Sequence, residues 1–208
     1  MEEYVRLSAA ERVPARPFTD PERSREDLTA LRVMVAILRE HLAASPLPES
    51  PRPLVRETRE ADGRPHRAII CRDAPLRARA DLEFVGFFAR RRPGLDFSPL
   101  TRADDELILE FPAHPGILSY SSLELPDGNW GNLIVLDRPE ARDRWREGAR
   151  HAYAAQELAP RYYSVVRLHH GRLPGGLLSG RDPVLTRTKY YDFGGPMPWR
   201  ADRDLSGG

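Results

Sequence analysis

Between residues 82 and 169 the sequence predicts strands that are apolar on both faces, and this feature constrains the fold most strongly. In the segment 82–90, alternate positions carry Phe84, Gly86 and Phe88 on one side and Val85, Phe87 and Ala89 on the other. A sheet with one solvated face would alternate apolar with polar residues. Two exposed Phe side chains would each forgo roughly 1.5–3 kcal/mol of burial. Both faces of this sheet must therefore be covered.

The order of the predicted elements is β-α-β-β-α-β, which is typical of a ferredoxin-like unit. Hydrophobic periodicity and Pro or Gly turn signals predict strands, helices and turns in this part of the chain. The predicted strands are 82–90, 117–125, 132–136 and 163–169, and the predicted helices are 98–111 and 138–159. Both helices of such a unit lie on one face of the sheet. We therefore expect an α+β fold in which the second face needs another cover.

Two covers are available for the second face. One is a second copy of the same sheet, which gives a two-fold homodimer. The other is the N-terminal 80 residues, which contain one strongly amphipathic helix at 25–44 with its apolar positions at Leu28, Leu31, Val35, Leu38 and Leu42. Because this segment offers only one such helix, the sequence favours the dimer.

Proline clusters and changes of pattern divide the chain into three parts. Residues 1–80 are predicted to hold an extended arm, the helix, a Pro-rich linker at 45–53 and a hairpin whose strands are 54–58 and 66–72. Residues 81–171 form the predicted ferredoxin-like domain. Residues 172–208 are predicted to be a loop, an edge strand at 184–191 and a loose end of fifteen residues.

Composition excludes several classes of protein. The 32 Lys and Arg residues nearly balance 31 Asp and Glu residues, which gives a net charge of +1 and no strong attraction to nucleic acid or to an anionic membrane. No apolar run is long enough to span a bilayer, and the N-terminus does not resemble a secretory signal, so we expect a cytoplasmic protein. Cys71 is the only cysteine, which excludes an intrachain disulfide and a cysteine-based zinc site.

Residues 82–171 resemble the antibiotic-biosynthesis monooxygenase type of the dimeric α+β barrel superfamily. The resemblance rests on the Phe/Val strand at 84–88, "HPGILSYSSLEL" at 114–125, "GNLIVLD" at 131–137, "RPEARDRW" from 138, "ARHAYAAQELAP" up to 160 and "YYSVVRLH" at 162–169. It implies a dimeric barrel with an apolar cavity. It also implies oxidation of an electron-rich aromatic or polyketide-like substrate without a cofactor, while other members of the superfamily bind haem.

Cofactor-free oxygenation needs a base, donors for an oxyanion and a dry pocket. Alternation along the last predicted strand places Arg167 and His169 on one side, opposite the expected helices. An imidazole beside a guanidinium is shifted toward its neutral form, as a base requires. We therefore predict His169 and Arg167 as catalytic, although His169 at the exposed end of a strand is the alternative.

A second set of candidates follows from the resemblance. His151 lies in the second helix at the position of a histidine common among relatives, where it would act as a base or, with haem bound, as the axial ligand. The predicted substrate-binding residues are Asn129, Trp130, Asn132, Tyr120 and Trp145. Each also has a structural interpretation, as a turn residue, a core residue or a solvated helix-edge residue.

Three functions remain open on these grounds. The first is a cofactor-independent, monooxygenase-like homodimer acting on a hydrophobic small molecule. The second is a haem-binding barrel with His151 or His169 as ligand. The third is a non-catalytic barrel that binds a ligand or a partner through its N-terminal arm.

Overall fold

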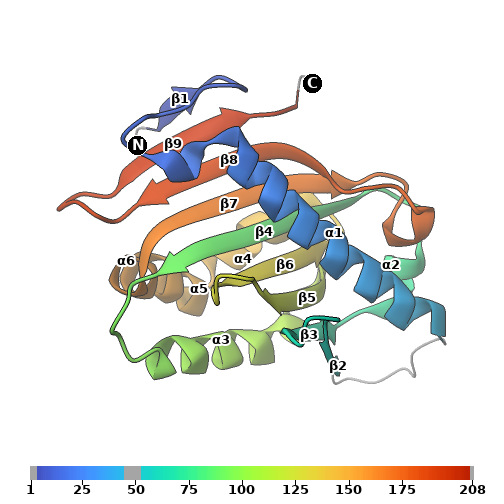
Figure 1. The fold of residues 1–208 in the computed structure, drawn as a ribbon. Helices are drawn as coiled ribbons and strands as arrows, with labels where there is room; N and C mark the ends of the chain where they lie inside the picture. The colour runs from blue at the N-terminus through green and yellow to red at the C-terminus, as the bar shows by residue number, and fades with distance from the viewer. Residues whose placement is uncertain (1–3, 45–52, 207–208) are drawn as a thin grey trace.

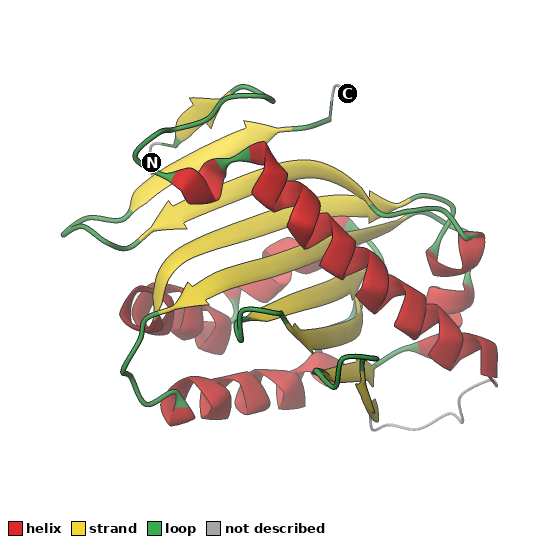
Figure 2. Ribbon diagram, in the orientation of Figure 1, coloured by secondary structure: helices red, strands yellow, loops and turns green. Residues whose placement is uncertain are grey.

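A computed structural model describes residues 4–44 and 53–206, in which nine strands form one continuous sheet (Figures 1 and 2). The predicted linker at 45–53 therefore lies almost wholly outside the described residues. The strand order is β1-β9-β8-β7-β4-β6-β5-β3-β2. The strands are β1 (Val5–Leu7), β2 (Leu54–Arg59), β3 (Pro65–Ile70), β4 (Leu82–Arg91), β5 (Ile117–Glu124), β6 (Trp130–Leu136), β7 (Tyr163–Leu173), β8 (Val184–Asp192) and β9 (Trp199–Asp204).

The helices divide between the two faces of this sheet (Figure 2). The long helix α1 (Pro21–Ala44) lies diagonally across the front of the sheet in Figure 1. The remaining α-helices are α2 (Asp73–Arg77), α3 (Ser98–Glu110), α4 (Pro139–Glu147), α5 (Ala149–Tyr153) and α6 (Ala159–Tyr162). Short helical turns are η1 (Pro17–Thr19), η2 (Phe111–Ala113), η3 (Ala154–Leu158) and η4 (Leu177–Ser179).

The predicted order of elements in the central part of the chain is confirmed. Strands β4, β5, β6 and β7 occupy the adjacent positions β7-β4-β6-β5, and each neighbouring pair is antiparallel. Helix α3 connects β4 to β5, and helices α4 to α6 connect β6 to β7. The hairpin predicted near residue 61 is also present, as the antiparallel pair β2 and β3. The α+β fold class is therefore confirmed.

Helix α1 covers the face of the sheet that the two central helices leave free. Its side chains Leu31, Met34, Val35, Leu38 and Leu42 are completely buried in one cluster with apolar residues of β4 and β6. Gly86 of β4 permits this close approach, because a Cβ atom there would lie 3.1 Å from the Leu31 side chain. The N-terminal part of the same chain, which was the second of the two predicted covers, therefore covers this face in the structure.

The C-terminal end of the chain differs from its prediction. Residues 194–208 were expected to be loose, but β9 pairs antiparallel with β8 and parallel with β1. Asp202 of β9 is buried and accepts hydrogen bonds from Arg187 of β8 and Arg6 of β1. Arg6 and Asp202 are 196 residues apart in the sequence, so no local pattern indicates that pair.

The helix predicted at 138–159 is interrupted. Gly148 has an extended backbone between α4 and α5, and η3 is a π-helical turn. Pro160 lacks the N–H that would bond to the carbonyl of residue 156, and this loss accompanies the irregular turn before it.

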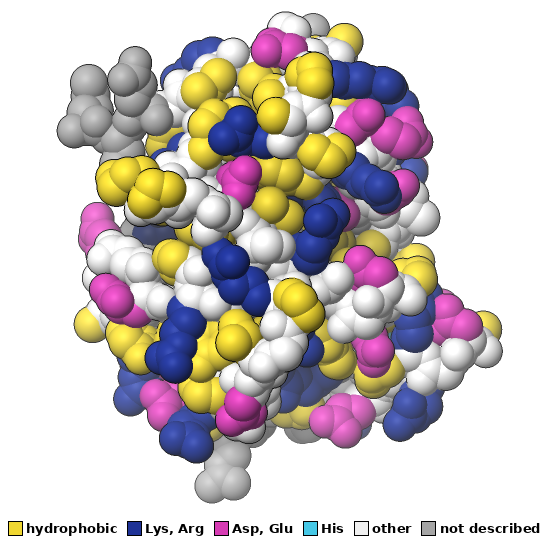
Figure 3. All heavy atoms as spheres, turned by 60° about the vertical axis from the view of Figure 1, so that its left-hand side comes forward, with side chains coloured by type: hydrophobic (Ala, Val, Ile, Leu, Met, Phe, Trp, Pro, Cys, Tyr) yellow, Lys and Arg dark blue, Asp and Glu magenta, His cyan; other side chains and the backbone are white. Residues whose placement is uncertain are grey.

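Charged side chains of both signs are mixed on the molecular surface. On the face shown in Figure 3, Lys and Arg side chains lie among Asp, Glu and hydrophobic side chains. This distribution agrees with the near-neutral net charge of +1. None of the described helices is long and apolar enough to cross a membrane.

Candidate functional site

The predicted catalytic residues His169 and Arg167 lie together beneath α1. Nε2 of His169 lies 2.8 Å from Oδ2 of Asp27, and Nδ1 lies 2.9 Å from Oγ1 of Thr188. Arg167 donates to both oxygens of the same Asp27 carboxylate, with 2.8 Å between Nη2 and Oδ1. The predicted sharing of one face by His169 and Arg167 is therefore confirmed.

The surroundings of His169 differ from the predicted cavity. Its side chain is completely buried, both ring nitrogens have partners, and the ring of Phe88 packs against it at 5.6 Å between centroids. Helix α1 fills the space in which a substrate would have to lie. The geometry therefore assigns His169 and Arg167 to joining α1 to the sheet, and their predicted catalytic role is not supported by an accessible cavity.

A second polar cluster lies on the opposite face of the sheet, beneath α3. The hydroxyl of Tyr120 on β5 donates to Oδ1 of Asp104 on α3 at 2.9 Å, and Nη2 of Arg67 on β3 lies 3.1 Å from Oδ2 of Asp104. Tyr120 is buried, whereas 37% of the Asp104 side chain remains exposed. Strands β3 and β5 thus each contribute one side chain that bonds to the carboxyl group of Asp104 on α3, and solvent can still reach this group.

Burial shifts the ionisation of this cluster. It raises the pKa of Asp104, although hydrogen bonds from Tyr120 and Arg67 and the charge of Arg67 act in the opposite direction. Burial and the neighbouring Asp104 charge raise the pKa of Tyr120 well above its ordinary value. Burial also raises the pKa of Tyr163 to about 12. Asp104 is therefore the acidic group of this cluster whose pKa is raised from its ordinary value, whereas both tyrosines are held further toward their protonated forms.

Two pairs of aromatic rings pack on the same side of the sheet as this cluster. Phe87 of β4 packs edge-on against Tyr163 of β7, with 5.6 Å between the ring centroids. Phe97 packs against Tyr162 at a tilt, with 5.7 Å between the ring centroids. Helix α3 itself contains no buried residue, and its inward-facing Leu107 and other apolar residues are only half-buried. The helix is therefore less tightly packed than α1 on the other face.

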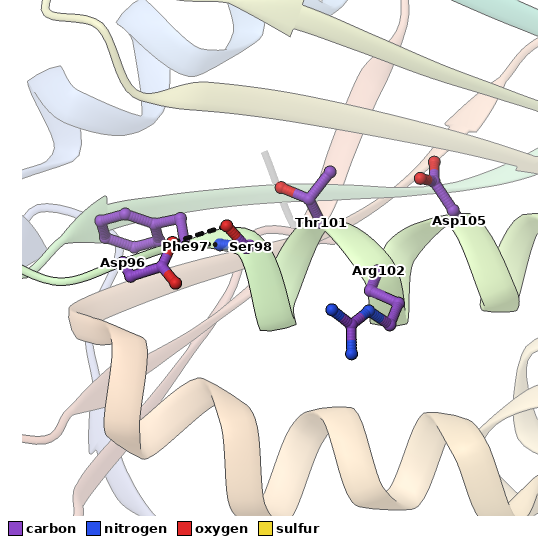
Figure 4. A pocket seen from close by; sticks show the side chains of 6 residues that line it. All are labelled: Asp96, Phe97, Ser98, Thr101, Arg102 and Asp105. Atoms are coloured by element: carbon purple, nitrogen blue, oxygen red, sulfur yellow. Dashed lines mark hydrogen bonds between the residues drawn. The ribbon is translucent and has the colours of Figure 1, made fainter.

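An open pocket of about 550 Å³ adjoins the N-terminal half of α3. Figure 4 shows Thr101 and Asp105 pointing to one side of this helix and Arg102 to the other. The remaining lining residues are Asp96, Phe97 and Ser98. Asp105 lies 3.4 Å from Nη1 of Arg67, so the pocket and the Asp104 cluster share Arg67 as a neighbour.

Trp145 and His151 lie on the same side of the sheet as Tyr120, and a series of ring contacts connects the three residues. The ring of Trp145 lies 5.6 Å from that of His151 and 5.1 Å from that of Phe111, which in turn lies 5.3 Å from Tyr120. Burial and the charge of Arg146 lower the pKa of His151 to about 4. His151 is therefore neutral at pH 7, as a base or a haem ligand requires.

The predicted residues near the β5–β6 turn divide between two roles. Asn129 belongs to the turn, because its side chain accepts from the backbone N–H of Arg91 and donates to Asp127. Asn132 is half-buried, lies opposite Phe87 in β4, and shares the α3-facing side with Ile134. Trp130 begins β6, opposite Glu124. By strand alternation, Trp130 and Asn132 both lie on the side of the sheet that Ile134 shares with Tyr120.

Sequence reasoning missed Asp104 and Arg67. One available signal was the position of Asp104 in its helix, where it follows Leu100 by four residues and precedes Leu107 by three, on the apolar side. A carboxylate on an apolar helix face needs a partner. The partner Arg67 lies 37 residues earlier, so its identity depends on the pairing of β3 with β5.

Neither of the two best-defined pockets includes His151 or His169 in its lining. The second pocket, of about 180 Å³, lies near the start of α1 beside Ser24 and Arg203. Among the described residues, no group of three or more His, Cys, Asp or Glu side chains is arranged to hold a metal ion. The thiol of Cys71 has its pKa raised to about 12 by burial, so it stays protonated at neutral pH.

Comparison with known proteins gives little further guidance. No protein-family model and no curated protein matches the chain. The chain is similar to protein SO0527 from Shewanella oneidensis, with 15% identity over 46% of this chain and 94% of that chain, at a TM-score of 0.38. It is also similar to an aldoxime dehydratase, with 13% identity over 70% of this chain and 36% of that chain, at a TM-score of 0.29. Both similarities are too weak to carry an argument about function.

Proposed function

We propose that this protein is a small-molecule enzyme whose site lies between α3 and the sheet, with Asp104 as the general base. The observation that carries the proposal is the Asp104 carboxyl group, which is partly exposed, has a raised pKa and is held by Tyr120 and Arg67. A general base is most effective when its pKa lies near the working pH. Burial of Asp104 moves its pKa in that direction.

The neighbours of Asp104 have separate tasks in this proposal. The hydroxyl of Tyr120 fixes the orientation of Oδ1, and Oδ2, which also contacts Arg67, is the oxygen that takes the substrate proton. The guanidinium of Arg67 supplies a positive charge beside the substrate anion that forms when Asp104 takes a proton. Arg67 and Tyr120 are therefore positioning and electrostatic groups, whereas Asp104 exchanges the proton.

The surrounding rings favour an aromatic substrate. Phe87 packs against Tyr163, Phe97 packs against Tyr162, and Phe97 also lines the pocket beside α3. Aromatic side chains prefer offset or edge-to-face contacts with other rings, which adds to simple apolar burial. The half-buried apolar face of α3 would gain contacts from a bound hydrophobic molecule.

The reaction that we propose is monooxygenation without a cofactor. Asp104 removes a proton from an activated CH₂ group of an aromatic substrate, and the resulting carbanion reacts with O₂. The CH₂ group and one O₂ together give a C=O group and one H₂O, so the balance requires no external reductant. This chemistry needs only a base, stabilisation of an anion and a site that excludes water.

A homodimer is part of this proposal. Helix α3 has Leu109 79% exposed and no buried residue, which leaves its side of the sheet less well covered than the side under α1. A second copy covering α3 would shield the partly exposed Asp104 side chain from water. Sedimentation equilibrium at micromolar concentration tests this part, and a clean monomer would contradict it.

Haem binding is the alternative function, because His151 is neutral at pH 7 and lies on the same side of the sheet. The residues around His151 do not fit haem as they stand, since Trp145 packs directly against the imidazole and neither of the two pockets described above includes it. No step of the proposed reaction therefore passes through haem. A Soret band after haem addition that is lost in His151→Ala would favour this alternative.

The experiment that tests the proposal measures O₂ consumption with an anthrone as substrate. We expect Asp104→Asn to lower the catalysed rate by about a hundredfold or more, because a general base commonly contributes that factor. The neighbouring Asp105→Asn serves as the matched control and should retain most of the activity. Equal rates for Asp104→Asn and the unaltered protein, or equal losses in both variants, would contradict the assignment of Asp104.

A further inference from the structure

A group of positively charged side chains gathers where α4 meets the strands β7 and β8, away from the Asp104 cluster. Thr188 and Tyr190 of β8 face α1, as shown by the contacts of Thr188 with His169 and of Tyr190 with Phe18. Strand alternation therefore places Arg187 and Lys189 on the opposite face. His170 of β7 lies directly across from Arg187.

Helix α4 adds two arginines to this group. Arg142 and Arg146 lie one turn apart on α4, and both carry positive charge close enough to depress the pKa of Lys189. Lys189 is the only lysine in the chain, and its side chain is half-buried. Its ammonium group lies 5.3 Å from the centre of the Tyr4 ring, which fixes the direction of the side chain.

His170 marks the buried end of the group. Its side chain is only 7% exposed, and Nδ1 is buried without a hydrogen-bond partner. Burial lowers the pKa of His170 to about 3, and the charges of Arg142, Lys189 and Arg187 act in the same direction. Because His169 faces α1, strand alternation places His170 on the same side of the sheet as Arg187 and Lys189. A buried, unpaired ring nitrogen beside three cations is an arrangement that an acceptor would complete.

Carboxylates in the described part of the chain lie near the cations of this group but leave Nδ1 of His170 without a partner. Among the described residues, Asp202 pairs with Arg187 and Arg6, and Asp143 pairs with Arg142 and lies 4.0 Å from Arg146. Asp204 also acts on Arg187, and Glu83 acts on Arg142, but no carboxylate that the structure describes bonds to Nδ1 of His170. Asp143 and Arg146 are both more than half exposed, so solvent weakens that pair.

We propose that His170, Arg142, Arg187 and Lys189 form a binding site for an oxyanion carried by a small molecule, either a phosphate or a carboxylate group. Arginine and lysine donate charge-assisted hydrogen bonds to such groups, and Nδ1–H of His170 supplies a donor at the buried end. The site is independent of the proposed reaction at Asp104. It would bind an anionic ligand where α4 meets β7 and β8.

The single lysine makes the site directly observable. Reductive ¹³C-methylation labels Lys189 and the N-terminal amine, so Lys189 gives one resolvable side-chain signal in an NMR spectrum. We would titrate the labelled protein with inorganic phosphate and, separately, with acetate, at constant ionic strength. A saturable shift of the Lys189 signal is expected with at least one of them, and the two arms distinguish phosphate from carboxylate.

Two variants locate the binding. Arg142→Gln should weaken it about tenfold, because one charge-assisted hydrogen bond commonly contributes that factor. Arg25→Gln changes an exposed arginine on α1 and should bind as the unaltered protein does. In the unaltered protein, bound anion should also raise the pKa of His170, which its ring-proton signals report.

Three outcomes would overturn the proposal. The Lys189 signal could shift only linearly with both anions, which means that no site exists. Arg25→Gln could weaken the binding as much as Arg142→Gln, which means that the response is general electrostatic attraction. A single-stranded oligonucleotide could saturate the signal when neither small anion does, which would assign the surface to a polymer.

Discussion

The carboxylate of Asp27 on α1 lies 2.8 Å from Nε2 of His169 on β7, at a separation of 142 residues in the sequence. The same carboxylate accepts two hydrogen bonds from Arg167. Burial by itself would raise the pKa of Asp27, but the hydrogen bonds from Arg167 and His169, together with their charges, hold it below its ordinary value. This contact is the polar link between the covering helix and the sheet.

We predict that Asp27→Asn strongly destabilises the protein. The substitution leaves the guanidinium of Arg167, which is only 16% exposed, without its charged partner. Removing one member of a buried ion pair costs about 3–5 kcal/mol of unfolding free energy. Urea denaturation measures the change, and Asp182→Asn, which affects an exposed pair with Arg32, should cost less than about 1 kcal/mol. A similar small loss in both variants would show that Asp27 does not hold α1 to the sheet.

The packing of α1 gives a second prediction. Leu31→Ala removes a completely buried side chain from the cluster that contains Phe84 and Phe88, and such changes cost about 2–5 kcal/mol. Val55→Ala, at a half-exposed position of β2, is the control and should change little. Because α1 covers its own sheet, the denaturation midpoint of Leu31→Ala should not depend on protein concentration. A midpoint that rises with concentration would indicate that another copy stabilises this face.

Acid should destabilise the folded protein through its buried histidines. Burial lowers the pKa of His66 and of His151 to about 4, below the value near 6.5 that an unfolded chain has. The unfolded state therefore binds more protons between these values, so stability is present above pH 6.5 and falls as the pH drops toward 4. His66 contributes about 2 kcal/mol to this loss between pH 7 and pH 5.

The variant His66→Gln checks this contribution. It should show a smaller loss of unfolding free energy between pH 7 and pH 5 than the unaltered protein, whatever its stability at pH 7. His114→Gln is a suitable control because it makes the same change at a histidine that is only partly buried. Identical pH profiles for His66→Gln and the unaltered protein would mean that His66 is not held neutral by the fold.

Tyr120 should tune the ionisation of Asp104. Its hydroxyl donates to the charged carboxylate, and this hydrogen bond lowers the pKa of Asp104 against the effect of burial. We therefore expect Tyr120→Phe to raise the pKa of Asp104 further. The carboxyl ¹³C signal of Asp104, followed against pH, measures the change, with Tyr153→Phe at an exposed position as the control. An unchanged or lower pKa in Tyr120→Phe would remove Tyr120 from the proposed site.

The candidate site shows where sequence patterns were sufficient and where they were not. Alternation in β7 correctly placed Arg167 and His169 on one face, because successive side chains of a strand point to opposite sides. The same reasoning did not show what lies over that face. The aromatic and histidine candidates Tyr120, Trp145 and His151 lie on the other face, so the predicted site is divided by the sheet itself.

The sequence by itself determined the elements of the central unit, their order and the need for a cover on both faces, because these follow from local periodicity and from the burial of apolar side chains. Tertiary structure decided which segment covers each face, which carboxylate pairs with Arg167, and that Asp104 meets Tyr120 and Arg67. Those contacts join residues 16 to 140 positions apart. Their formation depends on strand register and helix docking, which no local pattern encodes.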